Sequence, residues 1–336
     1  MVKKRAALPP GLIVRTGKFV WNTMWHTMMS QMAPRNQQGA YIRPESEFRS
    51  RDVAPEAHRY FLIVGMSCPW AHRTLVTRAL KGLTEAIDVF TVYPSTDEGR
   101  WLIEPDQSEP LLANCHALAD FYNRALPEYK GKYKGRATVP VLCDRKNKAI
   151  VNNESADIIQ ILNSQFGDLA TGPDLYPDAL KSQIDTLNQK IYDAVNNGVY
   201  RCGFAQTQAA YDHAIAELFD TLNELDSKLA TQRYLCGAQL TLADVRLFTT
   251  LVRFDVAYHG LFKCDRCRIA DYPNLSGYLR DIYQLPGIAK TCDIEAVKRD
   301  YYGNLFPLNP GGIVPVGPGW DELTAAHHRE SLAEKH

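Results

Sequence analysis

The sequence predicts an α/β domain followed by an all-helical domain. Between residues 59 and 165, short apolar runs of strand type alternate with helical patterns. Residues 166–178 are rich in glycine, proline and aspartate, which is typical of a linker. From 179 to about 318, apolar residues recur with helical periodicity. A chain of 336 residues is long enough for two such domains.

The first domain shows the element order βα, βα, ββα. The segment "RYFLIVG" contains a buried strand at 60–65, and the helix that follows at 69–82 ends at Gly82. A second strand, "IDVFTVY", occupies 87–93, and an insertion of about 94–136 contains the helical pattern "LLANCHALADFYNRAL". "TVPVLCD" and "KAIVN" then predict a hairpin, and "ESADIIQILNSQF" predicts an amphipathic helix.

The second domain is expected to contain five helices. The start of the third is marked by Thr241, which is followed three residues later by Asp244 in a variant of the capping box. The expected helices cover about 179–196, 208–230, 241–258, 273–284 and 293–303.

The two ends of the chain lie outside these domains. Residues 1–58 are expected to form an irregular extension, and 319–336 a charged tail. Within the extension, "FVWNTMWHTMMSQM" is rich in Trp, Phe and Met. It fits a surface-lying amphipathic helix or an arm packed on the body or on a second subunit, and we expect the arm. The role of the extension stays open.

Composition limits the possible partners and compartments. Lys and Arg together number 38, as do Asp and Glu, so no overall charge favours a nucleic acid or an acidic membrane. No apolar run has the length of a transmembrane helix. Eight scattered cysteines are too sparse for a disulfide framework and suggest reduced thiols. We therefore expect a cytoplasmic protein without stable membrane insertion. Because all the charged residues within 1–33 are basic, an organellar targeting segment stays open as an alternative.

Cys68 lies at the junction between the first strand and its helix. It occupies the expected N-cap position, and Pro69 fits the first helical position, where a missing N–H has no cost. The unpaired N–H groups and the helix dipole favour the thiolate there, with His72 and Arg73 within one turn as possible further contributors. We expect a reactive thiol with a pKa below neutral rather than an inert buried cysteine.

The surroundings of Cys68 indicate a partner thiol from outside the chain. Ala71 stands where a dithiol motif would carry its second cysteine, so an external thiol must resolve any mixed disulfide, and glutathione is the abundant cytosolic one. If the Val139–Pro140 bond is cis, the Val139 backbone forms an edge that can pair with a peptide-like ligand. Glu154 and Ser155 begin a helix that can receive the γ-glutamyl amine and carboxylate.

Several long motifs resemble those of a known family. "SCPWAHRTL", "VPVLCD" and "NNESADII" resemble the glutathione transferase superfamily. "IYDAVNNGVYRCGFA", "RYLCGAQLTLADVRLFTTLVRFD" and "IEAVKRDYYGNLFPLNPGGIVPVGP" narrow the resemblance to the glutathionyl-hydroquinone reductases, or xi class, over about 40–318. The resemblance implies the glutathione transferase fold, in which a thioredoxin-like domain precedes the all-α domain, usually as a homodimer. It also implies reductive deglutathionylation of glutathionyl-hydroquinones, with glutathione as co-substrate and no metal.

The resemblance also implies roles for single residues. Cys68 matches the nucleophile, Trp101 matches a tryptophan that packs against glutathione, and Arg100 beside it can hold a carboxylate. Three further residues match glutathione-binding positions: Val139, Glu154 and Ser155.

Two tyrosines match the positions that the family places over the hydroquinone. They are Tyr200 in "NNGVY" and Tyr301 in "RDYY", with Tyr302 as the alternative to Tyr301. A phenol can hydrogen-bond an aromatic hydroxyl while it presents an apolar edge. The chain departs from the family in "GNLF", Gly303 to Phe306, which follows the paired tyrosines and affects how Tyr301 is aimed.

Two other functions stay open. An omega-like transferase, acting as a dehydroascorbate reductase or general thioltransferase, would share Cys68 but would not need the tyrosines. A non-catalytic binding module on the same fold would need neither. "CDRC", Cys264 to Cys267, has metal-ligand spacing but lacks a second ligand pair, so structural thiols are expected. The sequence does not identify which hydroquinone is the substrate.

Overall fold

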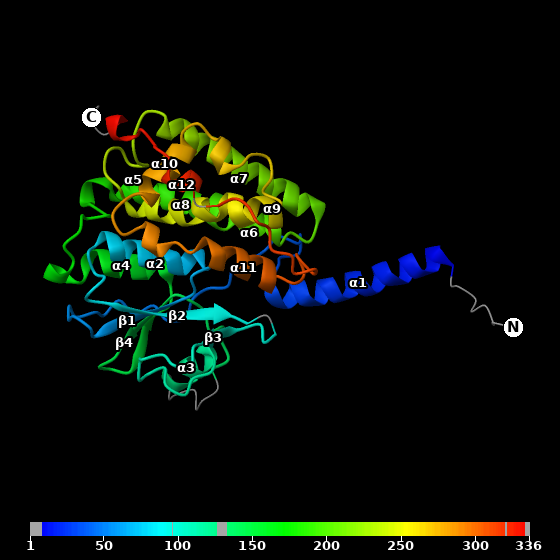
Figure 1. Cartoon of the computed structure of the whole chain (residues 1–336), viewed down its shortest axis with the longest axis horizontal. Coiled ribbons are helices and arrows are strands. Elements are labelled where there is room, and N and C mark those ends of the chain that lie inside the picture. Colours follow the sequence, from blue (N-terminus) through cyan, green and yellow to red (C-terminus); the bar gives the residue numbers. More distant parts are fainter. Residues whose placement is uncertain (1–8, 96, 126–132, 320, 333–336) are drawn as a thin grey trace.

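The computed structural model describes residues 9–95, 97–125, 133–319 and 321–332. Figure 1 shows a sheet domain below a layer of helices, with one long N-terminal helix that projects away from both. The predicted order of an α/β domain and an all-helical domain is confirmed.

A five-stranded mixed sheet forms the first domain, with the strand order β3-β2-β1-β4-β5. The central strand β1 pairs in parallel with β2 and antiparallel with β4, and all five of its apolar or aromatic residues are buried. The outer pairs β2–β3 and β4–β5 are antiparallel, so the predicted hairpin is confirmed. The strands are β1 (Tyr60–Val64), β2 (Asp88–Pro94), β3 (Trp101–Ile103), β4 (Val141–Asp144) and β5 (Ala149–Asn152).

Three helices complete this domain: α2 (Pro69–Leu80), α3 (Leu118–Ala125) and α4 (Ser155–Ser164). Helices α2 and α4 pack against each other between the sheet and the helical domain, and α3 lies on the opposite side of the sheet (Figure 1). Strand β3 was not predicted, because three residues are too few to show the alternation that marks a strand.

The second domain is built around α8, whose residues are all buried. The capping box of Thr241 and Asp244 at its start is confirmed. Two single π-helical turns, Tyr192–Asn196 and Phe254–Tyr258, interrupt its long helices. The α-helices are α5 (Lys181–Ile191), α6 (Gly198–Gly203), α7 (Gln208–Leu229), α8 (Leu242–Arg253), α9 (His259–Leu261), α10 (Leu275–Tyr283), α11 (Ile294–Asn304) and α12 (Asp321–Thr324). Short 3-10 turns occupy Gly167–Leu169, Asp178–Leu180, Ile269–Asp271, Ala289–Thr291 and Glu330–Leu332.

The N-terminal extension differs from its prediction. Instead of being irregular throughout, it contains the 23-residue helix α1 (Pro10–Met32). It reaches the body from Trp21 onward: Trp21 contacts Phe306, Trp25 donates to the carbonyl of Pro307, and Met29 is fully buried. The chain then runs along the sheet domain, and Arg49 forms a β-bridge with Asn152 at the end of β5. The extension therefore borders the carboxyl-terminal part of the sheet domain.

Candidate functional site

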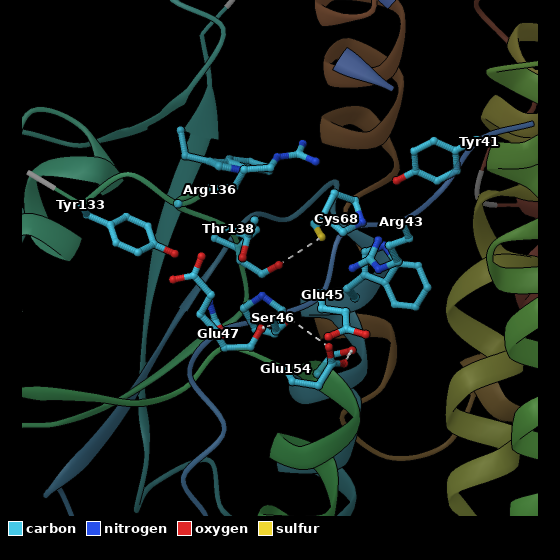
Figure 2. Close-up of a pocket in the computed structure, with 18 residues that line it drawn as sticks. Tyr41, Arg43, Glu45, Ser46, Glu47, Cys68, Tyr133, Arg136, Thr138 and Glu154 are labelled. Carbon is cyan, nitrogen blue, oxygen red and sulfur yellow. Dashed lines mark hydrogen bonds between the residues drawn. The ribbon is translucent and has the colours of Figure 1, made fainter. Parts of the chain in front are cut away.

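Cys68 is the N-cap residue of α2, as predicted, and Pro69 occupies the first helical position. Its backbone is extended (φ −76°, ψ 118°) and its side chain is half-buried. The thiol donates to the carbonyl of Val139, with 3.8 Å between Sγ and O (Figure 2). The Val139–Pro140 peptide bond is cis. The structure thus brings Cys68 and Val139 together.

The pKa of Cys68 departs from its prediction. The amides of Trp70 and Ala71 and the guanidinium groups of Arg43 and Arg253 all lower it. Burial is the largest effect, however, and it raises the pKa of the thiol above its ordinary value. The prediction of a pKa below neutral is therefore wrong for this structure, because the sequence shows the helix terminus but not the desolvation around it.

A buried arginine of the helical domain holds the loop that precedes Cys68. Arg253 donates to the carbonyls of Met66 (3.0 Å) and Ser67 (2.9 Å) and to Nδ1 of His72 (2.8 Å). Because arginine has no acceptor, Nδ1 must be unprotonated, and Nε2–H of the ring donates to Thr291 Oγ1 at 2.8 Å. Burial lowers the pKa of His72 well below its usual range. His72 is therefore neutral and does not add positive charge at Cys68, contrary to the expectation.

A cavity of about 300 Å³ adjoins the sulfur of Cys68. Tyr41 and residues 43–47 of the extension form one wall, and the segment before the cis proline, including Arg136, forms another (Figure 2). Trp101, Val139, Glu154 and Ser155 also line it, so the structure collects four of the predicted glutathione-binding residues around Cys68. The contribution of the extension was missed, since the irregular segment before the first strand carries no motif.

Cations line the part of this cavity nearest Cys68. The guanidinium carbon of Arg43 lies 3.7 Å from the ring centroid of Trp70, and that of buried Arg73 lies 4.3 Å from it. Arg43 and Arg136 form no ion pair with a carboxylate among the residues that the structure describes. Both can therefore receive an anionic group of a ligand.

Carboxylates line the opposite part of the cavity. Glu154 is the N-cap of α4 and accepts from the amide of Ala156 (3.0 Å) and the hydroxyl of Ser46 (2.9 Å). Ser155, buried beside it, accepts a longer hydrogen bond from Arg73 (3.4 Å). With cations near the sulfur and acids at α4, the cavity suits an extended, zwitterionic, peptide-like ligand.

Arg100 does not reach the cavity, although the resemblance placed it at the glutathione site. Its guanidinium is ion-paired with Glu98, and the side chain is about half exposed (47%). The adjacent Trp101 does reach it. The ring of Trp101 lies directly against Gly65, where an added Cβ would stand 2.4 Å from Cζ3. Glycine at this position is what allows the indole to cover the loop before Cys68.

A second cavity of about 290 Å³ lies on the other side of Cys68. Trp101, Arg43 and Arg136 border both cavities, and the second is lined further by Tyr200 and Tyr301. Tyr302, the alternative, lines neither of the two. A ligand that joins a peptide to an aromatic ring through sulfur can thus span both cavities, with its sulfur beside Cys68.

Three phenols form a hydrogen-bonded chain behind the second cavity. The hydroxyl oxygens of Tyr200 and Tyr301 lie 2.6 Å apart, and those of Tyr301 and Tyr258 lie 3.0 Å apart. Burial raises the pKa of all three, so they are protonated at neutral pH and available as hydrogen-bond donors. Tyr258 was missed, because a tyrosine on a buried helix has no feature in the sequence that separates it from core packing.

No group of His, Cys, Asp and Glu side chains suited to a metal ion occurs within the described part of the chain. Cys264 and Cys267 are free thiols, as are the other six cysteines.

The chain matches two family models. The N-terminal domain of glutathione S-transferase matches residues 67–165, and the C-terminal domain matches residues 208–281. The chain is 45% identical over 328 residues to the glutathionyl-hydroquinone reductase YqjG of Escherichia coli (strain K12), with 93% of this chain and 97% of that protein covered. It is 43% identical over 303 residues to the glutathionyl-hydroquinone reductase PcpF of Sphingobium chlorophenolicum, with coverage of 89% and 94%. The solved structure of glutathione-bound YqjG matches with a TM-score of 0.76 and 49% identity, covering 82% of this chain and 89% of that one.

Proposed function

Because the chain belongs to the glutathione transferases, among the glutathionyl-hydroquinone reductases, we propose that it reduces glutathionyl-hydroquinones at Cys68 with glutathione as co-substrate. The observation that carries this proposal is the position of Cys68 between a peptide-type cavity and a phenol-lined cavity.

The first step transfers the glutathionyl group to the enzyme. Cys68 loses its proton and attacks the glutathionyl sulfur, so a disulfide bond forms and the bond between that sulfur and the aromatic carbon breaks. The ring carbon takes up a proton, and hydroquinone leaves. The sulfur atoms are oxidised to a disulfide while the aromatic carbon is reduced, so electrons balance.

The second step restores the thiol. A free glutathione attacks the mixed disulfide, which releases oxidised glutathione and returns the Cys68 sulfur. Among the described residues Cys68 makes no disulfide, and the residue in the resolving position is Ala71. These facts favour an external thiol over an internal one.

The phenol chain would hold the hydroquinone. Tyr200 and Tyr301 face the second cavity as neutral phenols. The two hydrogen bonds of the chain use two of its three protons, so one proton remains to donate to a quinol oxygen, and the phenol oxygens can accept from a quinol hydroxyl. An aromatic diol can use both the remaining proton and the free lone pairs of these phenols. A ligand without hydroxyl groups would leave them unused.

The matched substitutions Tyr200→Phe and Tyr301→Phe test the quinol assignment, with Tyr302→Phe as control. We expect both to lower kcat/KM for glutathionyl-menadiol by about 10- to 100-fold while turnover of a simple glutathione mixed disulfide changes little. Equal losses on the two substrates would contradict the quinol assignment and favour an omega-like thioltransferase.

We also propose that the chain works as a homodimer in the cytoplasm. The family resemblance supports the dimer, and the eight free cysteines support a reducing compartment. Light scattering of the purified chain tests the first, and a monomeric mass would exclude it. Fractionation of cells that produce the chain tests the second.

A further inference from the structure

Helix α1 exposes an apolar surface that the fold does not use. All residues from Pro10 to Met24 are exposed, a stretch of about 22 Å at about 1.5 Å per residue, although Trp21 near its end meets the ring of Phe306. Figure 1 shows this part of α1 extending beyond both domains. Since helices in proteins owe most of their stability to packing of an apolar face, an unpacked helix of this length points to a missing surface.

The exposed part of α1 has two distinct faces. Ile13, Val14, Val20, Trp21 and Met24 follow the i, i+1, i+7, i+8, i+11 pattern of one helical face, with exposed fractions between 40% and 55%. We call this set the arm face.

Polar residues occupy the opposite face. Arg15, Lys18, Asn22 and His26 recur at i, i+3, i+7 and i+11. Phe19, 72% exposed, and Leu12 interrupt this side, so the helix presents apolar groups beyond the arm face as well.

Charge is distributed unevenly between this extension and the body. Residues 1–44 contain seven of the 38 basic residues and none of the 38 acidic ones, so they carry +7 and residues 45–336 carry −7. The projecting part of α1 extends farther than the Debye length of about 8 Å at physiological salt, so the acidic body screens it little. Arg15 and Lys18 lie on the projecting part of α1, whereas Arg43 lines the cavities beside Cys68, so it is the projecting part that complements an anionic surface.

We propose that α1 lies on an anionic lipid surface, with the arm face inserted at the headgroup level and Arg15 and Lys18 near lipid phosphates. A basic helix with Trp, Phe and aliphatic residues on its apolar face is the form that interfacial helices take. Within the described residues, no helix combines the length and apolarity needed to cross a membrane, so the proposal concerns surface binding. The α1 helix of a second copy fits less well, because it would bring further cations and offer no carboxylate to Arg15 and Lys18.

The position of α1 connects this surface with the second cavity. Trp25 Nε1 donates to the carbonyl of Pro307 (3.2 Å), and the rings of Trp21 and Phe306 are in contact, with centroids 6.3 Å apart. Met32, the last residue of α1, lines the second cavity itself. Lipid binding through α1 would thus hold the mouth of the second cavity close to the membrane surface.

Flotation of the full chain with phosphatidylcholine vesicles, with and without phosphatidylglycerol, tests the proposal at physiological ionic strength. We expect flotation only with the anionic vesicles. Arg15→Gln with Lys18→Gln should weaken it roughly 30-fold, and Ile13→Asp with Val20→Asp by at least about 100-fold. The control Lys146→Gln with Arg268→Gln, which removes two exposed cations from the body, should float like the unchanged chain.

Other outcomes would overturn the proposal. Absence of flotation, equal flotation on neutral vesicles, or normal flotation of Ile13→Asp with Val20→Asp would each do so. A further outcome is that the unchanged chain does not float and that light scattering gives Ile13→Asp with Val20→Asp a lower mass than the unchanged chain. In that case a second copy, and not lipid, covers the arm face. Activity of the same samples on a soluble substrate in lipid-free buffer should be unchanged, and its absence in the unchanged chain would count against the proposed function alone.

Discussion

Gly65 offers a direct test of how the site is built, because its missing side chain makes room for Trp101. An added Cβ would lie 2.4 Å from Cζ3 and 2.5 Å from Cη2 of the indole, whereas ordinary contacts begin at 3.4 Å. Gly65→Ala must therefore displace the ring by about 1 Å. The side-chain and backbone shifts that relieve such overpacking cost about 1–3 kcal/mol.

The displaced ring is expected to impair catalysis rather than folding. Trp101 borders both cavities, and a misplacement of about 1 Å at a site commonly costs up to about 100-fold in rate. We expect kcat/KM of Gly65→Ala to fall about 10- to 100-fold on glutathionyl-menadiol and on a simple mixed disulfide alike, since both carry a glutathionyl group. Steady-state kinetics with circular dichroism as a folding check measures this.

Gly303→Ala is the matched control, because a Cβ there meets no atom within 4 Å although the next residue, Asn304, lines the second cavity. It should retain the kinetics of the unchanged chain. If Gly65→Ala were folded and equally active, Trp101 would not be held by this contact, or it would not contact glutathione.

Three further predictions concern charge and pH. Arg136→Gln should raise KM for glutathione about tenfold in steady-state assays. Arg100→Gln, which removes a cation outside both cavities, should leave KM unchanged. The reverse result would show that Arg100, and not Arg136, binds glutathione. Because burial raises the pKa of Cys68, its alkylation by iodoacetamide should accelerate with pH to a midpoint above about 8.5, and a midpoint near or below neutrality would show that the helix terminus outweighs burial. Burial lowers the pKa of His72 in the folded chain, so unfolding should take up a proton below about pH 6.5. The free energy of unfolding that depends on His72 is therefore fully present above that pH. It falls by up to about 1.4 kcal/mol per pH unit as the pH drops towards the folded pKa. Urea denaturation should show a smaller loss between pH 7 and pH 5 for His72→Gln than for the unchanged chain or for exposed His213→Gln, and equal losses would contradict a neutral buried His72.

Much of the fold was predictable because local patterns and tertiary structure agree. The buried strand β1, the β4–β5 hairpin and the capped start of α8 each carry a periodicity or a turn signal that packing reinforces. Helix α1 was predicted only as one alternative and only for residues 19–32, because prolines and polar runs surround it and it makes few contacts with the body.

The site was only partly predictable, for a different physical reason. Cys68 and Glu154 are marked by their places at helix starts. Arg253 acts through contacts across the domain interface, and Tyr258 through a hydrogen bond to Tyr301, which lies 43 residues later within the helical domain. No local pattern records either contact. The direction of the Cys68 pKa shift likewise depends on burial by distant segments. A prediction from the helix terminus alone therefore expected a lowered pKa where the structure raises it.

Mass spectrometry of the chain after a single turnover tests the central claim most directly. The chain is mixed with glutathionyl-menadiol in the absence of free glutathione, then digested and mapped. The account predicts one glutathionyl group on the peptide that contains Cys68, menadiol released in equal amount, and loss of the added mass when glutathione is supplied. Release of menadiol without modification of Cys68, or with the added mass on another cysteine, would contradict it, and the absence of both would favour a non-catalytic binding module.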